Sequence, residues 1–141
     1  MGRVIHLERA GKERNRLARL VLTAIRLLGQ QEGINLRTRD LAAFVGLALG
    51  DLYATVDPSV EAWEKRGYWL KADRYRMEWM WADTLGKKMR SAVLDEDWGV
   101  VAMTSAEIAG RLAKVEVLKK LAGEEPWVGS WNKLKAGKPA G

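Results

Sequence analysis

Apolar residues recur at steps of three and four along most of this chain, a spacing that places them on one side of an α-helix. The first such segment extends from about Lys12 to Gln31, with Gly33 expected as its C-terminal cap. The second follows Thr38, which the pattern predicts as an N-cap. A later helix is expected to begin at the acidic run Asp95 to Asp97 and to continue to about Leu112. The inward-facing residues expected in these three segments are Leu17, Leu20, Val21, Ala24, Leu27 and Leu28; Leu41, Phe44, Val45, Ala48, Leu49, Leu52, Tyr53 and Val56; and Trp98, Val101, Ala102, Ser105, Ile108, Ala109 and Leu112.

The longest predicted helix runs from Pro58 to about Val93. Asp57 and Pro58 make a typical helix start, and a bend or break is expected at most at Gly67 or Gly86. This helix is apolar on two sides, which one neighbouring helix cannot cover. The side expected to pack into the protein carries Trp63, Leu70, Met77, Trp81, Leu85 and Met89. The opposite side is expected to remain available as a partner interface, and it carries Tyr68, Tyr75 and Trp79.

Together these segments predict an all-α fold: a bundle of four to five helices around one long central helix, at about residues 58–93. A chain of 141 residues suits one helical domain, 1–141, with a flexible tail from about residue 135. Trp127 and Trp131 are spaced to lie on one side of a short helical turn, so we expect them to dock onto the bundle. Val115 to Leu121 is expected to continue the preceding helix or to form a short separate one.

Small residues recur every four positions on the reverse side of the second segment, at Ala42, Gly46, Gly50 and Ala54. Such a row removes side-chain bulk and lets another backbone approach closely. Gly in a helix interior costs up to about 1 kcal/mol relative to Ala, so two of them indicate either that close contact or a turn. The sequence allows both interpretations.

Charge alternates along the chain in blocks. The whole chain has a formal charge of +6 and a pI near 9.7. Residues 1–39 have a net charge of +6 and residues 65–92 of +5, whereas residues 40–64 contain five acids and no Lys or Arg. This balance favours an anionic partner such as nucleic acid or an acidic lipid surface. If the two basic helices lie side by side they frame a cationic groove; otherwise the blocks pair with each other.

Lys12, Arg16, Arg19, Thr23, Arg26 and Gln30 of the first helix fall within about 80° of one another on a helical wheel, which makes a continuous basic stripe. Such a stripe is either a solvated helix face or a surface that follows a phosphate backbone. The residues predicted to bind nucleic acid are Lys12, Arg16, Arg19 and Arg26 on this helix, and Lys71, Arg76, Lys87 and Lys88 on the long helix.

Residues suited to catalysis are sparse. His6 is the single His, the chain has no Cys, and no phosphate-binding Gly loop or nucleophile motif is present. We therefore expect no enzyme activity, no metal and no cofactor. The lack of Cys and of a signal peptide favours a cytoplasmic location. The longest nearly uncharged run, Leu41 to Val56, carries Asp51 and is shorter than the roughly 20 residues of a spanning helix, so no membrane partner is expected.

One local resemblance lies between Arg39 and Trp63, about a quarter of the chain. Its residues are Arg39-Asp40-Leu41-Ala42-Ala43, Gly46-Leu47, Gly50, Leu52-Tyr53 and Glu61-Ala62-Trp63. They resemble the helix-turn-helix of TetR-type repressors. That resemblance implies that Leu47 to Val56 is a recognition helix, that Tyr53 contacts phosphate and that the protein is a dimeric DNA-binding regulator. The segment differs from the family's usual Ser, Lys and Thr near the recognition turn, where this chain has Ala48, Leu49 and Asp51.

In architecture, the chain is also similar to the small helical subunits of CRISPR effector complexes, which are of comparable size, basic and non-catalytic. That similarity implies binding to a nucleic-acid strand by backbone contacts, inside a larger protein complex. The leading prediction is therefore a non-enzymatic, basic helical subunit of a nucleoprotein complex that binds RNA or DNA without sequence readout, with protein subunits or a second copy as further partners. The alternatives are the TetR-like regulator and a helical scaffold or protein-interaction module.

Overall fold

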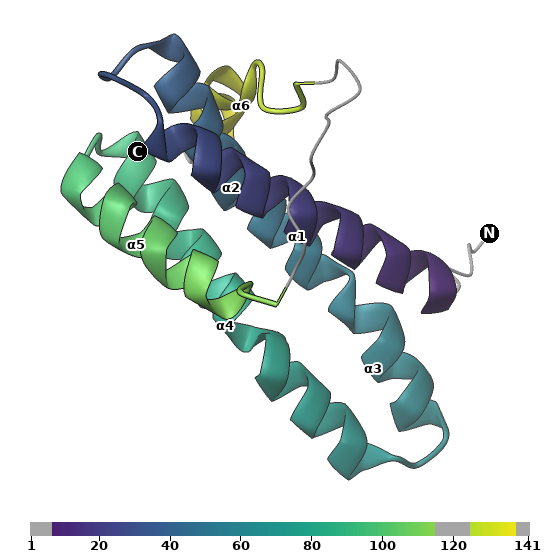
Figure 1. The fold of residues 1–141 in the computed structure, drawn as a ribbon. Coiled ribbons are helices and arrows are strands. Elements are labelled where there is room, and N and C mark those ends of the chain that lie inside the picture. The colour runs from purple at the N-terminus through teal and green to yellow at the C-terminus, as the bar shows by residue number, and fades with distance from the viewer. Residues whose placement is uncertain (1–6, 115–124, 138–141) are drawn as a thin grey trace.

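The computed structural model describes residues 7–114 and 125–137 as helices joined by short turns (Figure 1). The helices are α1 (Leu7–Gly29), α2 (Leu36–Ala54), α3 (Val56–Lys65), α4 (Trp69–Leu94), α5 (Trp98–Arg111) and α6 (Ser130–Ala136). Five of these helices have ten residues or more, α6 has seven, and the described residues contain no β-strand. The predicted all-α bundle is confirmed.

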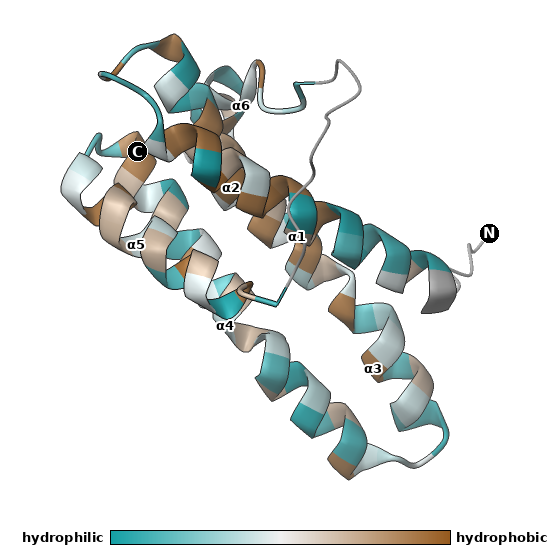
Figure 2. Ribbon diagram, in the orientation of Figure 1, coloured by the Kyte–Doolittle hydropathy of each residue, from teal (hydrophilic) through white to brown (hydrophobic). Residues whose placement is uncertain are grey.

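The core is built around α2, which packs against α1, α4 and α6, while α5 packs against α4. Ten residues of α2 are buried, including Leu41, Val45, Leu49 and Leu52. Apolar residues accordingly concentrate on α2 and the adjoining side of α1 (Figure 2). The predicted inward faces of α1 and α5 are largely correct: Leu17, Leu20, Val21, Ala24, Val101, Ser105, Ile108 and Leu112 are buried, Leu27, Leu28, Trp98 and Ala109 are half-buried, and Ala102 is exposed.

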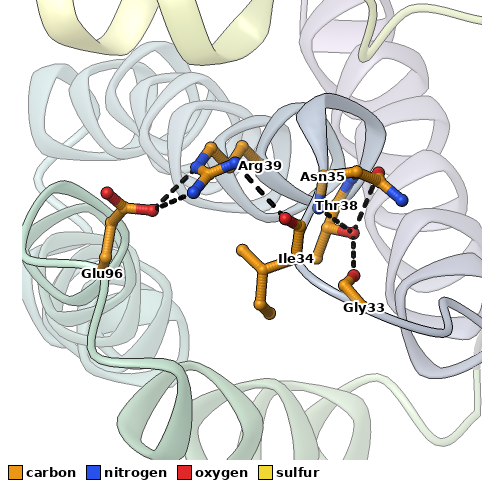
Figure 3. Close-up of polar contacts among 6 residues, drawn as sticks. All are labelled: Gly33, Ile34, Asn35, Thr38, Arg39 and Glu96. Atoms are coloured by element: carbon orange, nitrogen blue, oxygen red, sulfur yellow. Dashed lines mark hydrogen bonds and ion pairs between the residues drawn. The ribbon is translucent and has the colours of Figure 1, made fainter.

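The turn between α1 and α2 differs from the prediction in its capping residues. Asn35, not Thr38, is the N-cap of α2. The Asn35 side chain accepts a hydrogen bond from the Thr38 amide (3.0 Å), and the Thr38 hydroxyl accepts one from the Asn35 amide (3.3 Å) (Figure 3). This reciprocal pair is a capping box, in which Thr38 occupies the third helical position. The α1 helix ends at Gly29, so Gly33 is not its cap.

The predicted helix at 58–93 is divided into α3 and α4, because the chain breaks between Lys65 and Trp69, at one of the two positions where a bend or break was expected. Gly67 there has φ of +80°, a left-handed conformation that glycine adopts without strain and that ends a helix. The break folds α3 back against α4 as a helical hairpin, with the turn at its tip (Figure 1). At Gly86, the other expected position, α4 continues without interruption.

The row of small residues on α2 is a close helix contact and not a turn, since α2 is continuous through Gly46 and Gly50. A Cβ added at Gly46 would lie 3.2 Å from the backbone nitrogen of Arg90 on α4. A Cβ added at Gly86, on α4, would lie 3.1 Å from Cβ of Leu49. The Arg90 guanidinium donates to the carbonyl of Gly46 (2.7 Å), so the two helices are also joined by a hydrogen bond.

The C-terminal segment closes the bundle as predicted for Trp127 and Trp131. Trp127 is fully buried and meets the Phe44 ring edge-on, and Trp131 is half-buried. Asp40 of α2 is also buried, and its carboxylate accepts from the amides of Gly129 (3.2 Å) and Trp131 (2.9 Å). Asp40 therefore holds the start of α6, because it accepts hydrogen bonds from backbone N–H groups that have no partner within the helix itself.

Two predictions concern the C-terminal part of the chain. The α6 helix continues to Ala136, past the expected start of a flexible tail, while 115–121 and 138–141 lie outside the described residues.

By length and composition alone the segment Leu36–Lys65 would suffice to cross a membrane, but half of its most apolar window is buried in the fold. A helix at the centre of a bundle has the same composition.

Candidate nucleic-acid interface

Four predicted residues form one exposed surface on α1, here called the α1 basic face: Lys12, Arg16, Arg19 and Arg26. The buried residues Leu17, Val21 and Ala24 lie on the other side of this helix, against α2, so packing directs the basic side chains to solvent. Within the part of the chain that the structure describes, the only ion pair of these four is Arg16 with Glu13, at 3.2 Å. Both partners are exposed, and such a pair contributes at most about 1 kcal/mol.

The four basic residues predicted on α4 are in different environments. Arg76 pairs with Glu64 and with Asp73, each at 3.2 Å, and the hydrogen bond that Arg76 donates to the Glu64 carboxylate raises the pKa of Arg76 above its usual value. Lys87 pairs with Asp83 at 3.1 Å. Lys71 lies over the Trp63 ring, and Lys88 is exposed; neither pairs with an acid among the described residues. They form no continuous stripe comparable to the α1 basic face.

The two basic helices do not frame a common groove. Both α1 and α4 pack mainly against α2, which separates them. The contact that joins them is made by Arg14, a residue that the sequence analysis did not select. Arg14 is only 7% exposed, and its guanidinium lies 5.3 Å from the Tyr75 ring centroid and 5.6 Å from that of Trp79.

Arg14 anchors α1 to the junction of α2 and α3. Its guanidinium donates to the hydroxyl and the carbonyl of Thr55, each at 3.0 Å, and to the Ser59 hydroxyl at 3.4 Å. A buried cation is tolerated when neutral acceptors and aromatic faces replace its water. The signal in the sequence was its register: on a helical wheel Arg14 falls between Val21 and Ile25, inside the apolar side of α1.

The three residues of the predicted partner interface lie in different environments. Tyr75 and Trp79 are half-buried and pack inside the hairpin, where Tyr75 meets Trp63 edge-on at 4.9 Å. Tyr68, by contrast, is 54% exposed. The physical reason is the break at Gly67, which turns α3 onto the side of α4 that a continuous helix would have left open.

The opposite side of α4 is correspondingly uncovered in its N-terminal half. Leu70 and Met77, predicted to face the core, are 65% and 72% exposed. Ala72 is fully buried on the other side, because its small side chain allows α3 to approach. Farther along α4 the prediction is correct: Trp81 is half-buried and Leu85 and Met89 are buried.

Two features of the part of the chain that the structure describes bear on metal binding and on the helix-turn-helix resemblance. No group of three or more His, Cys, Asp or Glu there is placed to hold a metal ion. The segment that resembles a helix-turn-helix has no turn at Gly46 to Gly50, since both residues lie within α2. Comparison with known proteins finds no matching family model, no similar curated protein and no similar solved structure.

Proposed function

We propose that this protein is a non-enzymatic nucleic-acid-binding subunit that contacts the phosphate backbone of RNA or DNA through the α1 basic face. The observation that carries the proposal is the exposure of Lys12, Arg16, Arg19 and Arg26 on one side of a helix whose other side is fixed in the core. From Lys12 to Arg26 the face is about 21 Å long, at about 1.5 Å per residue. Several successive phosphates fit along that length.

Backbone contact without sequence readout agrees with the chemistry of this face. Lys and Arg on flexible stems neutralise phosphates, whereas reading bases requires a helix or strand that enters a groove with its polar groups. The helix-turn-helix-like segment, Arg39 to Trp63, is mostly buried in its α2 part and carries no Lys or Arg between Asp40 and Glu64. We therefore do not propose the repressor.

Membership of a larger complex forms the second part of the proposal. Large apolar side chains are exposed on the outer surfaces of α4 and α5, with Leu70 at 65%, Met77 at 72% and Met103 at 71%. Exposed apolar surface of this kind is typical of protein contacts. The small helical subunits of CRISPR effector complexes offer a comparison for such a role. The same residues favour a pure protein-interaction scaffold as the second candidate, which predicts no binding to nucleic acid.

Binding should be measured by fluorescence anisotropy with a labelled oligonucleotide over a series of salt concentrations. Four phosphate contacts predict a slope of log K against log salt of about −3.6 for duplex DNA and about −2.8 for a single strand. Unrelated sequences of equal length should bind equally well. Absence of binding even at low salt would contradict the proposal and favour the scaffold.

A pair of charge-matched variants separates the α1 basic face from net charge. The test variant carries Lys12→Glu, Arg19→Glu and Arg26→Glu, and the control carries Arg111→Glu, Lys114→Glu and Lys133→Glu, all at exposed positions. Both lower the formal charge equally. The test variant should lose most of its affinity and the control should keep it; equal losses would mean that only the net charge matters.

A further inference from the structure

The tip of the α3–α4 hairpin contains a hollow lined by residues of both helices, here called the hairpin hollow. It has a volume of ≈ 910 Å³ and is open to solvent. Its aromatic and basic lining residues are Trp63, Tyr68, Trp69, Lys71, Arg74 and Tyr75. None of these except Lys71 belongs to the predicted backbone-binding set, and the α1 basic face lies on another helix.

The aromatic rings of the hairpin hollow fall into two groups. Trp63 and Tyr75 are half-buried and pack edge-to-face with centroids 4.9 Å apart, so they form a fixed floor. Tyr68 and Trp69 are 54% and 60% exposed, and among the described residues neither ring stacks on another. Two large aromatic faces are therefore open to a flat ligand at the rim.

Positive charge surrounds these rings. Residues 65–74 contain four basic side chains, Lys65, Arg66, Lys71 and Arg74, and one acid, Asp73. Asp73 pairs with Arg76 at 3.2 Å. Lys71 and Arg74 are three positions apart on α4 and so project toward the same side, both lining the hairpin hollow. An anionic ligand would thus meet two cations beside the exposed rings.

We infer that the hairpin hollow binds unpaired bases of a single-stranded nucleic acid, which stack on Tyr68 and Trp69 while Lys71 and Arg74 contact the flanking phosphates. This inference rests on the proposed function and adds a preference for single strands over duplexes. Aromatic side chains beside Lys and Arg are the combination that holds single strands, since every base offers a stacking face. Bases inside a duplex are already stacked and cannot enter.

The shape of the surface favours a base over an anionic bilayer. Met77 and Met80 lie on the opposite side of α4 from Lys71 and Tyr75 at about 100° per residue, whereas the exposed Leu70 lines the hollow. Only part of the exposed aliphatic surface of α4 therefore adjoins the aromatic site. Glu78 also lines the hollow, where its carboxylate can accept a hydrogen bond from the amino group of a base.

The test compares a labelled single-stranded oligonucleotide, its duplex and an abasic single strand of equal length, at one moderate salt concentration. The variants are Trp69→Ala, Trp69→Phe and, as a matched control, Met77→Ala, which removes an exposed apolar side chain from the other side of α4. Trp69→Ala should weaken single-strand binding about 5- to 150-fold, the range for losing one stacked base. Duplex and abasic binding should change little, and Trp69→Phe should restore most of the affinity.

Five outcomes would overturn the inference, and they differ in what they leave standing. Equal affinity of the wild type for single strand and duplex, or an unchanged affinity in Trp69→Ala, would remove the stacking site and leave the α1 basic face intact. Tight binding of the free mononucleotide with no gain from a longer strand would assign the hollow to a soluble nucleotide. Trp69-dependent binding to phosphatidylserine vesicles without single-strand binding would assign it to lipid. Absence of any nucleic-acid binding would remove the proposed function as well.

Discussion

The substitution Gly46→Ala tests the close contact between α2 and α4. The added Cβ would lie 2.6 Å from Cγ of Arg90 and 3.2 Å from its backbone nitrogen. The Arg90 side chain is held by its hydrogen bond to the Gly46 carbonyl, and the backbone nitrogen moves only if α4 moves. Forcing extra volume into a packed interior costs about 1–3 kcal/mol.

Two further effects adjust this magnitude. Displacing the Arg90 guanidinium removes a hydrogen bond worth about 0.5–1.5 kcal/mol. Replacing Gly by Ala in a helix returns about 0.8–1 kcal/mol. The expected net result is a loss of about 0.5–3.5 kcal/mol in the free energy of unfolding. Each kcal/mol corresponds to a lowering of Tm by about 3–4 °C for a domain of this size.

Urea and thermal unfolding followed by circular dichroism measure this loss, and two other glycines provide controls. A Cβ at Gly11 in α1 would meet nothing within 4 Å, so Gly11→Ala should stabilise the protein by up to about 1 kcal/mol. At Gly50 the nearest atom is the guanidinium Nη1 of Arg90, at 3.1 Å. No backbone atom of α4 lies within 4 Å of that Cβ, so Gly50→Ala should cost less than Gly46→Ala. If Gly46→Ala is as stable as wild type, α2 and α4 are not in the close contact described.

Three further predictions concern side chains that join distant parts of the chain. Arg14→Met should lower the free energy of unfolding by about 2 kcal/mol in urea unfolding, because it removes the charged hydrogen bonds to Thr55 and Ser59; an unchanged midpoint would contradict the buried anchor. Asp40→Ala should release α6 from the bundle. Limited proteolysis should then show faster cleavage near Gly129, and the fluorescence of Trp127 should shift to the red. Unchanged cleavage would mean that Asp40 does not hold this segment. Mutating Glu64→Gln should return the pKa of Arg76 toward its ordinary value and leave stability near neutral pH almost unchanged, since this pair is partly exposed; a large loss in thermal unfolding would contradict that reasoning.

Local sequence patterns predicted most of the helices but not how they fold onto one another. The apolar spacing of α2 and the acidic start of α5 are local signals, and both led to correct helices. The capping residue was misplaced because Thr38 takes part in the cap without being its first residue; Asn35, three positions earlier, completes the motif. Such an error shifts a boundary without changing the fold.

The larger error arose at Gly67, and it carried over to the candidate site. A helix pattern continues on both sides of that residue, so periodicity alone does not reveal that the chain reverses there. Once α3 folds back, it covers Tyr75 and Trp79 and leaves Leu70 and Met77 exposed. Which apolar side of a helix is buried depends on its neighbours, and a helical wheel contains no information about them. The α1 basic face was predictable because α1 has one apolar side only.

The buried position of Trp127 has a consequence for the order in which this protein is made. Its ring occupies the core beside Phe44 of α2, although 82 residues separate the two along the chain. During synthesis the ribosome releases α2 long before Trp127 emerges. The nascent bundle must therefore present an uncovered apolar surface around Phe44 until the last part of the chain arrives, and a chaperone would meet that surface first.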